Sequence, residues 1–137
     1  MNSVLNKDTL LEYPLVDMQY VEQGRDLMGE AYEQMVAFLM EDAAAHVKSM
    51  CEALESNNFS EVAQPAHTMK SSAKQLGAVQ LSELSKRIEA CAKQVDEMPS
   101  LQEELVKDIV ALVDVLEATW LAYRDIGVEV EKGNWVD

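Results

Sequence analysis

Two histidines, His46 and His67, are the side chains of this chain best suited to chemistry near neutral pH. A neutral imidazole can act as a nucleophile, a general base or a metal ligand. At about 100° per helical residue, His46 lies within about 60° of the centre of its segment's apolar stripe, so it should flank the core. His67 points about 140° away from the stripe of its own segment, so we expect an exposed imidazole.

The residues that share this outer face with His67 are polar and carry no negative charge. They are Ser60, Gln64, Lys70, Ser71, Lys74 and Gln75. No acid occurs between residues 62 and 77, although the whole chain is acidic. Lys70 lies one turn from His67 and can neutralise the charge of a phosphoryl group on the imidazole. The alternative is a chance histidine on an ordinary solvated face, and the residues alone leave both interpretations open.

Other kinds of chemistry find little support in the sequence. Cys51 and Cys91 lack the spacing of a zinc site or a disulfide framework, so we expect two buried thiols. The chain has no glycine-rich nucleotide loop and no His-Glu-x-x-His motif. His46 and His67 fall on different segments and different faces, which argues against a shared metal site. We therefore expect neither a metal nor a cofactor of its own, and no autonomous enzyme activity.

Length and charge narrow the class of protein further. A chain of 137 residues is about one domain long. Its 25 acids against 11 bases give a formal charge of −14, which disfavours nucleic acids and anionic membrane surfaces as partners. No apolar run approaches about 18 residues and the start does not resemble a signal peptide. We expect a cytoplasmic monomer.

The apolar residues recur at helical spacing along most of the chain, and glycines and prolines are few. Asp17 is a candidate cap for a short helix ending near Gly24, and Ser60 is one for a helix that stops at Gly77. The other helices are expected at about 29–55, 79–96 and 101–124. The prediction is an all-α, antiparallel up-down-up-down four-helix bundle with the short first helix as a lid.

Three regions follow from this pattern. Residues 1–14 form an N-terminal lead-in, residues 15–125 form the bundle, and residues 126–137 form a C-terminal tail. The tail contains Trp135 near an acidic end, and its sequence is compatible either with disorder or with packing against the bundle.

Residues 66–78 read AHTMKSSAKQLGA. This run resembles the signature of histidine-containing phosphotransfer (HPt) domains of bacterial two-component phosphorelays, usually Ala-His-Thr-Leu-Lys-Gly-Ser followed by a hydrophobic-Gly-Ala step. The similarity covers roughly residues 15 to 96, and the fourth helix matches in pattern only.

The resemblance implies a role for each matching residue. His67 would be the phosphorylated residue, Lys70 would support the phosphate, and Gly77 would close the helix. Ser71 stands where glycine is usual, at the small residue that lets a partner approach. Glu89 falls where the family often has Gln or Glu near the imidazole, although a solvated helix residue is an equal alternative.

The same resemblance implies the partners. A receiver domain of a hybrid histidine kinase would donate the phosphoryl group, and the receiver domain of a response regulator would accept it. The receiver domain would also supply the Mg²⁺. The alternative function is a helical adaptor bundle without phosphotransfer.

Overall fold

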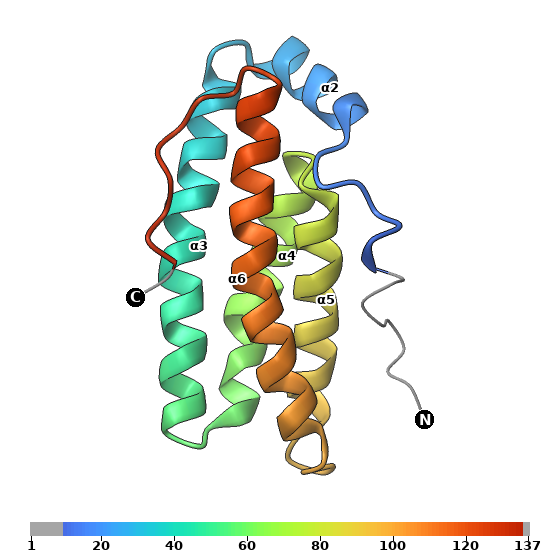
Figure 1. Ribbon diagram of the computed structural model, residues 1–137, viewed down its shortest axis with the longest axis vertical. Coiled ribbons are helices and arrows are strands. Elements are labelled where there is room, and N and C mark those ends of the chain that lie inside the picture. Colours follow the sequence, from blue (N-terminus) through green and yellow to red (C-terminus); the bar gives the residue numbers. More distant parts are fainter. Residues whose placement is uncertain (1–9, 136–137) are drawn as a thin grey trace.

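The structure, a computed structural model, describes residues 10–135. Its elements are α2 (Met18–Met28), α3 (Ala31–Glu55), the 3₁₀ turn η1 (Phe59–Val62), α4 (Ala63–Gln75), α5 (Val79–Gln94) and α6 (Leu101–Asp125). No strand occurs within this range. Figure 1 shows the four long helices side by side, each running opposite to the one before it, with α2 across one end of the bundle. The predicted all-helical fold is confirmed.

The core lies between the apolar faces of the four long helices. Most of the inward positions expected from the helical period are buried, among them Val36, Met50, Met69, Leu84, Ile88, Leu105 and Leu116. Burial of each such side chain contributes about 1.5–3 kcal/mol, which is how amphipathic helices of modest intrinsic stability are held together. Between residues 10 and 135, no helix is both long and apolar enough to cross a membrane.

The turn between α4 and α5 depends on Gly77. Its φ of +90° lies in the left-handed region, which residues with a Cβ rarely adopt. The Gly77 N–H donates to the carbonyl of Lys74 at 3.1 Å, and the Ala78 N–H donates to that of Ala73 at 2.9 Å. This pair of bonds is the Schellman ending of a helix, so the predicted stop of this helix at Gly77 is confirmed.

Two buried tyrosines fix the same end of α4 from other helices. The Leu76 carbonyl accepts a hydrogen bond from the Tyr32 hydroxyl of α3 at 2.5 Å and another from the Tyr123 hydroxyl of α6 at 2.8 Å. Burial raises the pKa of both phenols, so both stay protonated and able to donate. Three helices thus meet at one carbonyl, which sets the position of α4 along the bundle axis.

The segment before α3 covers this end of the bundle. Asp17 caps α2, as expected, because its Oδ1 accepts from the Gln19 N–H at 2.9 Å. The Asp17 N–H donates to the Gly77 carbonyl at 2.8 Å, and the Gln80 N–H donates to the Pro14 carbonyl at 3.0 Å. These bonds tie the predicted lid to the α4–α5 turn (Figure 1).

The expected end of the short helix at Gly24 is wrong. Helix α2 continues to Met28, and Gly29, whose φ is +59°, is its C-cap. Gly24 lies inside the helix, where a Cβ would come within 2.6 Å of the Tyr32 ring. The glycine makes room for a neighbouring aromatic ring and does not stop the helix.

Two further expectations from the sequence are corrected. Ser60 does not cap α4, because it lies inside η1 and its carbonyl accepts from the Ala63 N–H. Pro65 in the first turn of α4 has no N–H, so one fewer backbone donor there needs a hydrogen-bond partner.

The expected burial of both cysteines is also wrong. Cys51 is exposed and Cys91 is half-buried, so neither is the fully buried thiol expected. Cys51 follows Met50 by about 100° of helical rotation, which turns it away from the core.

The tail packs on the bundle as far as residue 135. It runs along α3 and α6, as Figure 1 shows in red. The Trp120 indole N–H donates to the Val130 carbonyl at 2.9 Å, and Lys132 pairs with Glu117 at 2.7 Å. Trp135 is buried against the core cluster. Of the two states that the sequence allows for the tail, residues 126–135 adopt the packed one. Residues 1–9, which belong to the expected lead-in, and residues 136–137 lie outside the described range.

A partly buried ion pair fixes α5 against α6. The Arg87 guanidinium donates from Nε and Nη2 to the two oxygens of Asp108, at 3.0 and 2.7 Å. Bidentate pairs of this kind are directional, so they set the rotation of a helix as well as its distance from a neighbour. Glu89, two residues after Arg87, consequently faces away from α6.

The two left-handed glycines that end α4 and α6 provide a matched stability test. A Cβ at Gly77 would lie 3.0 Å from the Tyr20 Cβ and 3.1 Å from the Asp17 carbonyl, whereas one at Gly127 (φ +86°) would meet nothing within 4 Å. Gly127→Ala should cost about 1 kcal/mol of unfolding free energy from the backbone alone, and Gly77→Ala about 1–2 kcal/mol more. Urea denaturation followed by circular dichroism measures both. Equal losses would contradict the close contact of α2 with the α4–α5 turn.

Candidate functional site

His67 lies on the outer face of α4, with 53% of its side chain exposed, as its position on the helix predicts. Its Nδ1 is 2.8 Å from Oε2 of Glu89 on α5. Since an ionised carboxylate can only accept, Nδ1 carries the proton in this hydrogen bond. The neutral imidazole then keeps its lone pair on Nε2, which makes no hydrogen bond within the described part of the chain. This is the arrangement that a nucleophilic histidine requires.

Glu89 is buried, with only 7% of its side chain exposed, and it has three donors. Oε1 accepts from Lys70 Nζ at 2.7 Å, and Oε2 lies 2.8 Å from His67 Nδ1 and 3.1 Å from Lys93 Nζ. Burial raises the pKa of the carboxyl, but hydrogen bonds from Lys70, Lys93 and His67 outweigh this effect and lower the pKa to about 2. Glu89 is therefore a carboxylate at neutral pH. The alternative of a solvated helix residue is excluded.

The closeness of α4 and α5 makes this contact possible. Ser82, Ser85 and Glu89 follow one another at spacings of three and four on a buried stripe of α5. The Ser82 hydroxyl donates to the Lys70 carbonyl at 2.8 Å, so the two helices are bonded directly beside the site. Small side chains in the stripe let the backbones approach, and the longer Glu89 reaches His67 at its end.

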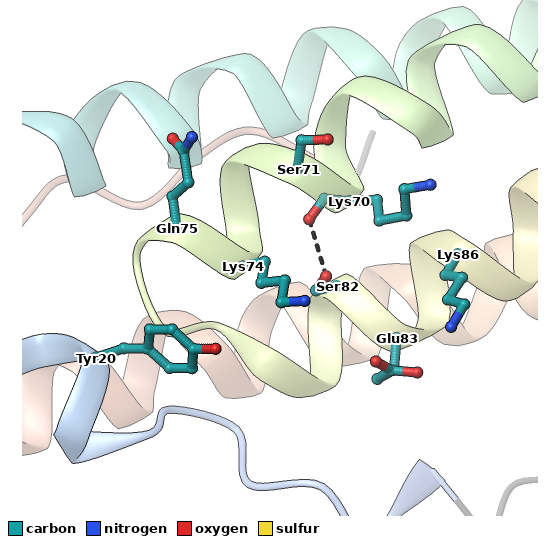
Figure 2. Close-up of a pocket in the computed structure, with 8 residues that line it drawn as sticks. All are labelled: Tyr20, Lys70, Ser71, Lys74, Gln75, Ser82, Glu83 and Lys86. Carbon is teal, nitrogen blue, oxygen red and sulfur yellow. Dashed lines mark hydrogen bonds between the residues drawn. The ribbon is translucent and has the colours of Figure 1, made fainter.

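A shallow groove continues from the site along α4 and α5. It is lined by Tyr20, Lys70, Ser71, Lys74, Gln75, Ser82, Glu83 and Lys86. Figure 2 shows lysines from both helices on this groove, with the α2 tyrosine at one end. Three lysines against one glutamate give the groove a positive character on an otherwise acidic protein.

The predicted supporting residues differ in how close the structure brings them to the imidazole. Lys70 reaches it through Glu89, and Ser71 is exposed one turn beyond His67. Gly77 shapes the end of α4. Gln64 and Lys74 are exposed, and no hydrogen bond joins either to His67 among the described residues. The role of each in transfer stays a prediction.

Lys93 is the site residue that sequence reasoning missed. It stands four residues after Glu89 on α5. This spacing and order favour a Glu–Lys pair on a helix, so the sequence alone could have indicated Lys93.

His46 does not take part in this site. It lies half-buried on α3, where burial lowers its pKa and the Asp42 carboxylate opposes that shift. Among residues 10–135, no group of three or more His, Cys, Asp or Glu side chains could hold a metal ion.

The fold and site together define a class of protein: a helical bundle that presents one oriented, exposed imidazole from its second long helix. Comparison with known families gives the same class, because the profile of the Hpt domain matches residues 34–120. The chain belongs to the Hpt domain family, whose members carry out histidine phosphotransfer in two-component phosphorelays. Comparisons with curated proteins and with solved structures gave no significant match.

The low pKa of Glu89 predicts how stability depends on pH. A carboxyl whose pKa falls on folding contributes stability that is complete above its unfolded value, near 4.5, and is lost as the pH drops towards 2. Glu89→Gln lacks this contribution, which is on the order of 3 kcal/mol. The difference in unfolding free energy between the parent and Glu89→Gln should therefore shrink steadily from pH 5 to pH 2.

Urea unfolding at several pH values measures this difference, with Glu52→Gln as the control. Glu52 is exposed on α3 and forms no ion pair with the described residues, so its replacement should give a small difference that does not change with pH. A difference for Glu89→Gln that is equally flat would contradict the ionised, three-donor carboxylate.

Proposed function

We propose that this protein is a phosphorelay carrier in which His67 receives a phosphoryl group from the aspartate of a hybrid histidine kinase's receiver domain. It then passes the group to the receiver domain of a response regulator. The observation that carries the proposal is an exposed imidazole whose Nδ1 is held by a buried carboxylate, which leaves Nε2 as the nucleophilic nitrogen. A purely adaptor function would have no need for this orientation, because a docking surface does not depend on which ring nitrogen is protonated.

The proposed transfer is a direct displacement at phosphorus. The Nε2 lone pair attacks in line, the bond from phosphorus to the aspartyl oxygen breaks, and the aspartate leaves as a carboxylate. The Nδ1 proton stays in its hydrogen bond to Glu89, so the carboxylate stabilises the positive ring that forms, as a carboxylate does beside other catalytic histidines. Transfer to the second receiver is the same step in reverse.

The two sides of the complex contribute different things. The chain supplies a positioned nucleophile and local positive charge, chiefly from Lys70, which can turn towards the phosphoryl oxygens. The receiver domain is expected to supply the Mg²⁺ as well as the phosphoaspartate, so the carrier needs no metal of its own. We place this exchange in the cytoplasm and expect a monomer to be sufficient, since a single chain carries all the residues of the site.

Substitution of His67 gives the direct test. His67→Gln should abolish labelling from any phosphorylated receiver domain, while its melting temperature stays close to the parent's because the position is exposed. His46→Gln is the matched control and should be labelled at the parent rate. Mass spectrometry and acid lability of the label identify the modified residue. Label that persists in His67→Gln would exclude this histidine as the acceptor.

Ser71 tests whether the face around His67 is the docking surface. Ser71→Gly should keep transfer and lose about 0.5–1 kcal/mol of stability through backbone freedom. Ser71→Gln should fold normally but slow transfer from a receiver domain by about tenfold or more, because one obstructing side chain in a contact can cost over 1.4 kcal/mol. Stopped-flow or rapid-quench kinetics with one cognate receiver measures the rates.

Phosphoramidate, a small phosphoryl donor, is the control, because it can phosphorylate His67 without a receiver domain binding to the protein. It should label Ser71→Gln as fast as the parent, because it needs no protein to approach. If the Gln variant instead accepts phosphate from the receiver domain at the parent rate, the receiver docks elsewhere.

A further inference from the structure

The two oxygens of the Glu89 carboxylate have different partners. Among residues 10–135, Oε1 accepts from Lys70 Nζ alone, at 2.7 Å, whereas Oε2 is shared by His67 Nδ1 at 2.8 Å and Lys93 Nζ at 3.1 Å. Lys70 and His67 belong to α4, while Lys93 belongs to α5, the same helix as Glu89. The carboxylate is thus held by one cation from across the helix interface and by one from its own helix.

This division matters once His67 carries a phosphoryl group. Lys70 is the cation one turn from His67, but in the unphosphorylated protein its ammonium is already occupied by Glu89. When Lys70 turns to the phosphoryl oxygens, Oε1 loses its partner. Without Lys93, the positive ring of phosphorylated His67 would then be the single cation beside a carboxylate that is 93% buried, and such a carboxylate would draw Lys70 back.

We propose that Lys93 is a positioning residue that keeps Glu89 charged and aligned on His67 Nδ1, and so releases Lys70 to neutralise the phosphoryl group. The inference rests on the proposed function and deepens it. Lys93 suits this task because its bond to Oε2 lies within α5 and does not change when Lys70 moves. It has 65% of its side chain exposed, so its replacement should leave the fold intact.

Labelling of the full chain by phosphoramidate tests the role without any partner protein. Lys93→Ala should accept phosphate about 3- to 10-fold more slowly than the parent, the range expected for loss of one partly buried ion pair, and Lys93→Arg should restore the rate to within about twofold. Lys107→Ala on α6 controls for the loss of one positive charge, since Lys107 is exposed and forms no ion pair within the described chain. It should label at the parent rate.

A double-mutant cycle separates action through Glu89 from a general effect of charge. In a Glu89→Gln background the neutral amide needs no counter-cation, so adding Lys93→Ala should change the rate no further. The inference is overturned if Lys93→Ala labels as fast as Lys107→Ala, or if it slows labelling equally in the Glu89→Gln background.

Nitrogen-15 NMR of unphosphorylated His67 gives a readout that does not depend on transfer. Lys70→Ala should keep the proton on Nδ1, because Lys93 still holds Glu89, whereas the double variant Lys70→Ala/Lys93→Ala should shift towards a mixture of tautomers. Unchanged spectra in the double variant would overturn the positioning role. A parent protein that accepts phosphate from no receiver domain, while these NMR shifts occur as expected, would instead overturn the proposed function.

Discussion

The buried carboxylate of Glu89 is the interaction on which the site depends. A charge removed from water must be compensated, and here two ammonium groups and one imidazole from two helices do so within 3.1 Å. Each donor gains orientation from the same carboxylate, so the tautomer of His67 and the positions of both lysines depend on one buried charge. The charge pairs of the site therefore also hold α4 against α5. The hydrogen bond from the Ser82 hydroxyl to the Lys70 carbonyl strengthens the same contact.

The C-terminal end of α4 is also fixed, by contacts with three other helices. The Leu76 carbonyl is shared by tyrosines from α3 and α6, and Gly77 closes the helix under the α2 lid. A helix fixed at its end and along one side has little freedom to rotate or slide. His67 is consequently presented in a fixed direction before any partner arrives, which reduces the ordering that transfer requires.

The charge distribution suits a protein that carries a phosphoryl group for a time. The chain has a formal charge of −14, yet no acid occurs between residues 62 and 77, and lysines from α4 and α5 line the adjoining groove. A phosphoryl dianion beside the carboxylates that predominate elsewhere in the sequence would be repelled. On α4 it meets cations at short range, where screening by salt is weak.

Local chemistry along the chain was enough to predict the four long helices, the cap at Asp17, the helix stop at Gly77 and the exposed face of His67, because each depends on residues within a turn or two. Tertiary structure decided the rest. Helical period cannot reveal that Glu89 meets a histidine 22 residues away, since the rotation of α5 is set by Arg87 and Asp108. Gly24 was misread for the same reason: a ring from another helix fills the space beside it. Lys93 matters for the site because Glu89 is buried, and a buried charge is costly to leave without a partner. This burial arises only when the four helices pack together, so it cannot be predicted from the sequence of α5 alone.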